Sequence, residues 1–365
     1  MTNAPPAKQT PPGAPLLEVV PPGRKPILVR ATNWIGDVVM TLPALEALRE
    51  RYPGKRIAVL ARPWVREILA SHPAVDEVID LPRGKGRARD LAGLWLAAGR
   101  IRRTGFGMAV LFQNAFEAAL IARLARVPIR VGYDTDGRRL LLTHPVSRKS
   151  APGGAHQTGY YLNLVRALGW RGEPREPRLH VAGPEREAAS LRLAEQGVRP
   201  GQRILGLAPG AAFGPAKRWP PERFAAAADR AADAWDAAVI VLGSEGDREA
   251  CRAVSSAMHR RPLDLCGRTG LGRAVALIAS CDLFLTNDSG LMHVASALEV
   301  PTVAVFGSTD PTATGPLGSR SRVVRNPVSC APCLRPVCPE DYRCLTGVSV
   351  DDVWREMGAL VEEDP

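Results

Sequence analysis

Short apolar runs alternate with longer segments of helical periodicity through the first half of the chain. Runs of strand length between turn residues predict buried strands, and apolar positions spaced three and four apart predict helices. The predicted strands span 26–31, 56–61, 77–81, 108–112 and 129–133, and the predicted helices span 37–51, 63–70, 91–103, 115–124 and 156–168. This alternation predicts a doubly wound parallel sheet.

The second half repeats the pattern after a proline-rich stretch at 169–184, which we interpret as a linker. The predicted strands span 204–208, 238–243, 263–266, 282–287 and 300–307, and the predicted helices span 221–234, 246–258, 272–279 and 291–298. Segment 137–154 is expected to be a surface loop. A last helix, at about 350–361, has no evident place in the second sheet, and we consider that it crosses back over the first domain.

These elements predict an α/β protein of two Rossmann-like domains. We expect a disordered tail at 1–25, domains at 26–175 and 176–348, and a C-terminal helix at 349–365. Two such domains joined by one linker would face a central cleft lined by the carboxyl edges of both sheets.

Composition narrows the class of protein. The 365 residues are 45% hydrophobic and 23% charged, as in soluble globular proteins, and no apolar run reaches the roughly 18 residues of a membrane span. The first residues lack the apolar core of a signal peptide, so we expect a cytoplasmic protein. The net charge of +11 favours polyanionic partners, namely nucleic acid, nucleotide phosphates or an anionic membrane surface. Because no nucleic-acid-binding motif accompanies that charge, nucleic acid is not the expected partner.

The stretch 281–311 predicts a strand, a turn, a helix and a second strand. Asp288 or Ser289 stands where a helix N-cap belongs, and Gly290 lets the backbone approach a ligand closely. Free backbone N–H groups at such a helix start favour an anion such as a phosphate. An ordinary capped helix is the alternative interpretation.

A second glycine-rich loop, 207–220, leaves a predicted strand and ends near Lys217. Neither G-x-G-x-x-G after the first strand nor a P-loop motif occurs in the sequence, which argues against a dinucleotide oxidoreductase and a P-loop NTPase. Lys217 facing the amides of Ser289 and Gly290 would complete a diphosphate clamp, and a solvated lysine is the alternative.

Four stretches together resemble the ADP-heptose:lipopolysaccharide heptosyltransferases. They are WIGDVVMTLPALEALRERYP at 34–53, PGAAFGPAKRWP at 209–220, NDSGLMHVASALEVPTVAVFGSTDP at 287–311 and CAPCLRPVCPEDYRCL at 330–345. The resemblance covers nearly the whole chain beyond residue 25. It implies an inverting GT-B glycosyltransferase that needs no cofactor and transfers heptose from ADP-heptose to the inner core of lipopolysaccharide, on a Kdo-lipid A acceptor.

The resemblance also implies roles for individual residues. Asp37 corresponds to the catalytic base, since an inverting transfer needs one carboxylate to take the proton of the acceptor hydroxyl. The implied donor-binding residues are Lys217, Asp247, Thr269, Asp288, Ser289, Gly290 and His293. The expected acceptor-binding residues are Asn33, Trp34, Gly36, Arg83, Lys85 and Arg87. Without the resemblance, a helix cap is the simpler interpretation of Asp37.

All seven cysteines lie in the second half, and Cys330, Cys333, Cys338 and Cys344 form a compact cluster. Their spacing is compatible with a structural Zn²⁺ or iron–sulfur site, although it departs from paired C-x₂-C knuckles. Free thiols or a labile disulfide are the alternatives.

Within the family, the cysteine-rich tail favours the type that adds the second heptose. The near alternatives are the first-heptose type and another ADP- or NDP-sugar glycosyltransferase of the same family with a different core acceptor. A non-catalytic nucleotide-sugar-binding protein on the same fold would keep Lys217 without needing Asp37. We expect a monomer that associates peripherally with the cytoplasmic face of the inner membrane.

Overall fold

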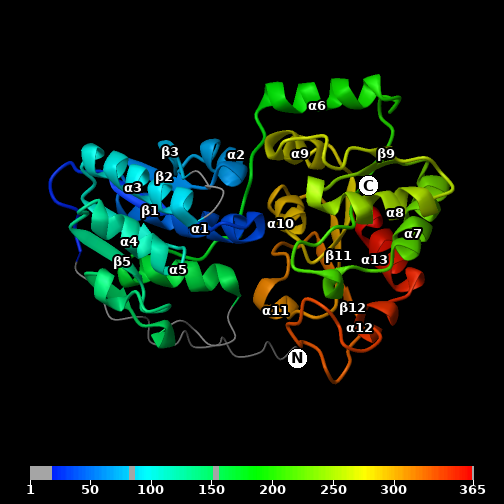
Figure 1. Ribbon diagram of the computed structural model, residues 1–365. Helices are drawn as coiled ribbons and strands as arrows, with labels where there is room; N and C mark the ends of the chain where they lie inside the picture. The colour runs from blue at the N-terminus through cyan, green and yellow to red at the C-terminus, as the bar shows by residue number, and fades with distance from the viewer. Residues whose placement is uncertain (1–18, 82–86, 151–155, 364–365) are drawn as a thin grey trace, which may run out of the picture. The chain divides into compact units, whose positions relative to one another are not determined.

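The computed structural model describes residues 19–81, 87–150 and 156–363 (Figure 1). Most of the expected N-terminal tail, 1–18, lies outside the described residues. The chain divides into two compact units: unit 1 comprises 1–32, 43–63 and 73–175, and unit 2 comprises 33–42, 64–72 and 176–365. The segment 33–42 directly follows the first strand in the chain but belongs to unit 2.

Unit 1 is built on a parallel six-stranded sheet in the order β3-β2-β1-β4-β5-β6. Its strands are β1 (Ile27–Arg30), β2 (Ile57–Ala61), β3 (Glu77–Asp80), β4 (Met108–Leu111), β5 (Ile129–Tyr133) and β6 (His144–Val146). The helices that follow these strands in the chain are α1 (Ile35–Arg51), α2 (Arg66–Ala70), α3 (Arg87–Thr104), α4 (Phe116–Leu124) and α5 (Gln157–Ala167). Of these, α2 and the first half of α1 belong to unit 2. Because the strand order reverses between β1 and β4, their carboxyl ends mark the expected ligand-binding edge.

Unit 2 contains a second parallel six-stranded sheet, in the order β12-β11-β10-β7-β8-β9. Its strands are β7 (Ile204–Ala208), β8 (Ala238–Val241), β9 (Leu263–Asp264), β10 (Leu283–Asn287), β11 (Thr302–Phe306) and β12 (Ser321–Arg325). Its helices are α6 (Gly183–Glu195), α7 (Pro221–Trp235), α8 (Arg248–Ala257), α9 (Leu271–Ile278), α10 (Gly290–Ala297), α11 (Pro311–Thr314), α12 (Arg343–Thr346) and α13 (Val350–Glu362). The strand order reverses between β7 and β10, so both sheets have the same Rossmann arrangement.

The central strands are short and almost fully buried because helices cover both faces of each sheet. In unit 2, α7, α8 and α13 lie on one side of the sheet and α9 and α10 lie on the other (Figure 1). β5 and β7 have the predicted bounds, and most other elements differ from prediction by a few residues at their ends. The alternating pattern therefore identified the two sheets.

Several elements differ from expectation. Segment 137–154, expected to be a surface loop, contains β6, and the linker prediction ran past the start of α6. The last helix, α13, has a place against the second sheet: Val353, Met357 and Leu360 are buried in its core. The ring of Trp354 also stacks on Trp235, with centroids 4.6 Å apart. The apolar face of α13 is therefore buried within unit 2.

Candidate active site

Two loops meet at the carboxyl edge of the second sheet, at the point where the strand order reverses. One loop follows β7 and the other follows β10, and the two strands are parallel neighbours. The buried side chain of Asn287 joins both ends of the first loop. Its Oδ1 accepts from the backbone N–H of Trp219 at 2.9 Å, and its Nδ2 donates to the carbonyl of Pro209 at 2.7 Å. Asn287 thus fixes the loop that carries Lys217.

Lys217 and Asp288 form a buried ion pair between these loops. The Lys217 Nζ lies 2.6 Å from Oδ2 of Asp288, and the two side chains are only 14% and 5% exposed. The hydroxyl of Thr309 donates to the same carboxylate oxygen at 2.5 Å. Lys217 Nζ also lies 5.0 Å from the ring centroid of Phe213, within cation–π range. The pair brings one cation and one carboxylate to the edge where ligands bind in this fold.

The backbone beside Lys217 is held by two further segments. The N–H of Ala216 donates to the carbonyl of Pro336 at 3.0 Å, and the N–H of Ser308 donates to the carbonyl of Ala216 at 3.3 Å. Pro336 lies within the cysteine-bearing segment, so that segment supports the loop of Lys217. This fixed position reduces the reorganisation needed to present the ammonium group to a ligand.

The start of α10 packs directly on the segment 33–42 within unit 2. Ser289 occupies the N-cap position of α10, and its Oγ lies 3.2 Å from Oγ1 of Thr286. A Cβ added to Gly36 would lie 2.7 Å from Cδ2 of His293 and 3.6 Å from Cα of Gly290. Only glycine permits this approach at position 36. Asp37, in the first turn of α1, therefore directly follows a backbone contact with the start of α10.

Comparison with known proteins gives one consistent family. The family described as Glycosyltransferase family 9 (heptosyltransferase) matches residues 96–343. Lipopolysaccharide heptosyltransferase 2 of Escherichia coli strain K12 is 33% identical over 315 residues, covering 82% of this chain and 87% of that protein. This chain belongs to glycosyltransferase family 9, the heptosyltransferases.

Two solved structures agree with that assignment. The structure of the E. coli ADP-heptose LPS heptosyltransferase II aligns with a TM-score of 0.79 and 30% identity, covering 93% of this chain and 100% of that one. The glycosyltransferase family 9 protein of Veillonella parvula aligns with a TM-score of 0.84 and 25% identity, covering 95% of this chain and 100% of that one. The predicted GT-B class, with two doubly wound Rossmann-like domains, is confirmed, and the protein is a glycosyltransferase.

Two other donor residues expected from the heptosyltransferase resemblance lie in loops of unit 2. Asp247 faces the loop after β7: a Cβ added to Gly210 would clash with Asp247 Oδ1. Oδ2 of Asp247 accepts from Ser244, at 3.0 Å from its N–H and 2.6 Å from its hydroxyl. This contact orients the carboxylate at the end of β8. Thr269 is half-buried in the loop between β9 and α9.

The expected acceptor residues are only partly described. The carbonyl of Asn33 accepts from Nε1 of Trp64 at 2.8 Å, and the side chain of Trp34 is exposed. Arg83 and Lys85 lie outside the described residues, and Arg87 is the first residue of α3. The acceptor roles of all these residues stay predictions.

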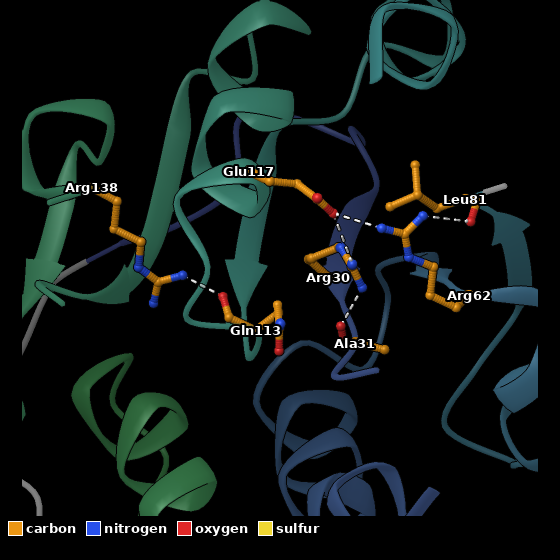
Figure 2. Close-up of polar contacts among 7 residues, drawn as sticks. All are labelled: Arg30, Ala31, Arg62, Leu81, Gln113, Glu117 and Arg138. Atoms are coloured by element: carbon orange, nitrogen blue, oxygen red, sulfur yellow. Dashed lines mark hydrogen bonds and ion pairs between the residues drawn. The ribbon is translucent and has the colours of Figure 1, made fainter. Parts of the chain in front are cut away.

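A cationic cluster that the sequence analysis did not identify lies at the carboxyl edge of the first sheet. Figure 2 shows the carboxylate of Glu117 between the guanidinium groups of Arg30 and Arg62. Oε1 of Glu117 accepts from Nη2 of Arg30 at 3.5 Å and from Nη2 of Arg62 at 3.2 Å. Arg30 also donates to the carbonyl of Ala31. One carboxylate therefore contacts two guanidinium groups at this sheet edge.

Burial makes the charge on Arg30 costly. The side chain is 1% exposed, and burial lowers the pKa of its guanidinium to about 10, while the charge of Glu117 opposes that shift. Arg138, at the same sheet edge, is also buried, and burial lowers its pKa to about 10. It donates to the backbone carbonyls of Tyr133 and Gln113 and to Oδ1 of Asn114. Arg138 therefore joins the loops after β4 and β5.

Replacing Glu117 with glutamine is expected to lower the free energy of unfolding by about 1–2 kcal/mol, because the buried Arg30 loses a charged hydrogen-bond acceptor. The expected loss is small because the Glu117 side chain is 33% exposed, so solvent screens its interaction with the arginines. Chemical denaturation measures the change. Glu222→Gln, which removes the same charge from the first turn of α7, is the matched control. Equal losses in the two variants would mean that helix-end electrostatics, not the arginine contacts, account for the effect.

The cysteine cluster does not form a metal site in the structure. Cys330, Cys333, Cys338 and Cys344 are free thiols. Burial, followed by the proximity of the other three sulfur atoms, raises the pKa of Cys344. Within the described part of the chain, no three His, Cys, Asp or Glu residues are arranged to hold a metal ion. The observed role of the segment is to support the backbone next to Lys217.

Proposed function

We propose that this protein transfers heptose from ADP-heptose to the inner core of lipopolysaccharide, adding the second heptose to the first. The observation that carries the proposal is the 33% identity over 82% of the chain with a lipopolysaccharide heptosyltransferase 2. A further relative, lipooligosaccharide heptosyltransferase 2 of Haemophilus ducreyi, is 31% identical over 317 residues and supports the same type. The reaction would take place at the cytoplasmic face of the inner membrane.

In the proposed reaction, Asp37 accepts the proton of the acceptor hydroxyl as its oxygen attacks the anomeric carbon of the heptose. The new C–O bond forms as the bond from that carbon to the diphosphate oxygen breaks, which releases ADP with inversion. Negative charge grows on the leaving diphosphate, and Lys217 with the amides at Ser289 and Gly290 would stabilise it. The contact of Gly36 with the start of α10 supports placing Asp37 and these groups around one sugar nucleotide.

Asp288 is then the partner that holds Lys217 before the donor binds. A buried ammonium group paired with one carboxylate can exchange that partner for a phosphate oxygen without being left unpaired. Asp247, Thr269 and His293 are proposed to complete the donor site. Asn33, Trp34 and Gly36 are proposed for the acceptor. The guanidinium groups of Arg30 and Arg62, at the carboxyl edge of the first sheet, support an acceptor that carries phosphate or carboxylate groups.

The function is tested by incubating the protein with ADP-heptose and defined Kdo-lipid A acceptors that carry no heptose or one heptose. Mass spectrometry then identifies the products. We expect a mass increase of one heptose only on the acceptor that already carries one. Transfer onto the heptose-free acceptor would instead identify the first-heptose type. ADP binding without transfer to either acceptor would identify a nucleotide-sugar-binding protein.

A further inference from the structure

The outward face of α3 carries large apolar side chains. Ala97, Ala98 and Ile101 bury the inner face of this helix in the core of unit 1. On the outer face, Trp95 and Leu96 are 64% and 75% exposed. Isolated exposed apolar residues are ordinary, but two consecutive large apolar side chains exposed on the outer half of one helix are a feature that often contacts a partner.

The same face becomes strongly basic toward the end of the helix. Arg100, Arg102 and Arg103 are exposed, and the sequence 92–104 contains no acidic residue. Helical periodicity places Arg102 two turns after Trp95 and Arg103 two turns after Leu96. Arg100 lies 3.7 Å from Glu77 of β3. The apolar pair and the cationic turn are therefore adjacent parts of one surface.

We propose that this face of α3 is a membrane-docking surface that binds an anionic phospholipid bilayer. Trp95 and Leu96 would enter the interfacial region, and Arg102 and Arg103 would contact lipid phosphates. The chemistry matches that environment, because tryptophan is amphipathic and prefers the interface, and arginine binds phosphate in a fork geometry. Within the described residues no helix has the length and apolar character needed to cross a bilayer. The inferred attachment is peripheral.

Charge complementarity favours a membrane over an apolar protein partner. An exposed arginine near an anionic membrane strengthens binding by about fivefold, and the effect falls with ionic strength. The apolar pair adds a contribution that salt does not remove. The inference deepens the proposed function and rests on it, because a lipid-linked acceptor would be present in the same membrane. The surface itself is defined by α3 alone.

The inference is tested by vesicle co-sedimentation with the full chain. Phosphatidylcholine vesicles with and without phosphatidylglycerol are used at low and high ionic strength. We expect salt-sensitive binding to the anionic vesicles only. The variant Trp95→Gln/Leu96→Gln should bind at least about tenfold more weakly, and Arg102→Gln/Arg103→Gln should lose about 20-fold at low salt.

Matched variants separate this surface from general charge and hydrophobicity. Leu191→Gln removes an exposed leucine from α6, and Arg252→Gln/Arg261→Gln removes the same net charge from exposed positions in unit 2. Both should bind vesicles as the unmodified protein does. Equal weakening by these controls, unchanged binding by the α3 variants, or no binding by the unmodified protein would each overturn the inference.

Transfer to a detergent-dispersed acceptor distinguishes docking from catalysis. The α3 variants should keep that activity and lose activity toward the same acceptor embedded in anionic vesicles. If vesicle binding depends on α3 but no heptose is transferred in either form, the docking surface stands and the proposed function fails. If transfer proceeds in both forms and the α3 variants bind vesicles normally, the proposed function stands and the docking surface fails.

Discussion

Replacing Asp37 with asparagine is expected to lower kcat by about 10²- to 10⁴-fold, the usual contribution of general-base assistance. Asparagine keeps the size of the side chain and can still accept hydrogen bonds, but it cannot take up a proton from the acceptor hydroxyl. The affinity for ADP should change little, because the proposed diphosphate contacts come from the loops after β7 and β10. ADP release in the presence of acceptor measures the effect, and calorimetric titration with ADP measures donor-site binding.

The competing explanation is that Asp37 only stabilises the first turn of α1, where an acidic residue favours the helix macrodipole. That role predicts a loss of about 0.5–1 kcal/mol in stability with kcat preserved. Glu185→Gln is the matched control, because Glu185 accepts from the N–H of Ala182 at 3.1 Å at the start of α6. A D37N variant that is as slightly destabilised as E185Q but fully active would remove Asp37 from the mechanism.

The pH profile adds a second distinction. A general base produces an acidic limb in kcat/KM, because the reaction requires its unprotonated form. The residual activity of the Asp37→Asn variant should lack the acidic limb. The Asp37→Glu variant should keep an acidic limb and part of the rate. If Asp37 were purely structural, its substitution would change neither the shape of the pH profile of kcat/KM nor its midpoint.

Periodicity identified both Rossmann sheets because their central strands are buried on both faces and are bounded by turn residues. Two edge strands, β6 and β12, lack that signal. β6 contains Pro145 and pairs with β5 alone, and β12 has only one buried residue, Val324, between the exposed Val323 and Arg325. α13 was placed wrongly for a related reason. Its apolar face was visible in the sequence, but the surface that receives it is assembled from distant strands.

Residues of the candidate site could be predicted where they lie in a loop with a recognisable sequence pattern. Lys217 and Asp288 were both identified from glycine-rich or capped turns after predicted strands, yet their ion pair was not foreseen. The contacts of Glu117 with Arg30 and Arg62 span 87 and 55 residues. No local sequence pattern predicts such a cluster, because the order of strands in the sheet brings these distant charged residues together. The backbone hydrogen bond from Ala216 to Pro336 could not be predicted from the sequence for the same reason.

Replacing Lys217 with methionine is expected to have two separate effects. The value of kcat/KM for ADP-heptose should fall by about 10²- to 10³-fold, because a preorganised group that stabilises the leaving diphosphate is lost. The free energy of unfolding should fall by about 3 kcal/mol, because the buried carboxylate of Asp288 loses its cation. Steady-state kinetics measures the first effect and chemical denaturation measures the second. Saturating ADP should raise the Tm of the unmodified protein by much more than that of the variant.

The double variant Lys217→Met/Asp288→Asn separates these effects. It removes both buried charges, so stability should recover most of the loss seen in Lys217→Met while activity stays low. Arg260 and Asp233 provide the control cycle, because they lie 2.8 Å apart with both side chains exposed and should couple by only about 0–1 kcal/mol. If the double variant regained activity with stability, Lys217 would be a structural residue. If instead the single variant kept normal ADP binding and kcat/KM, the diphosphate would have to be held by other groups at this sheet edge.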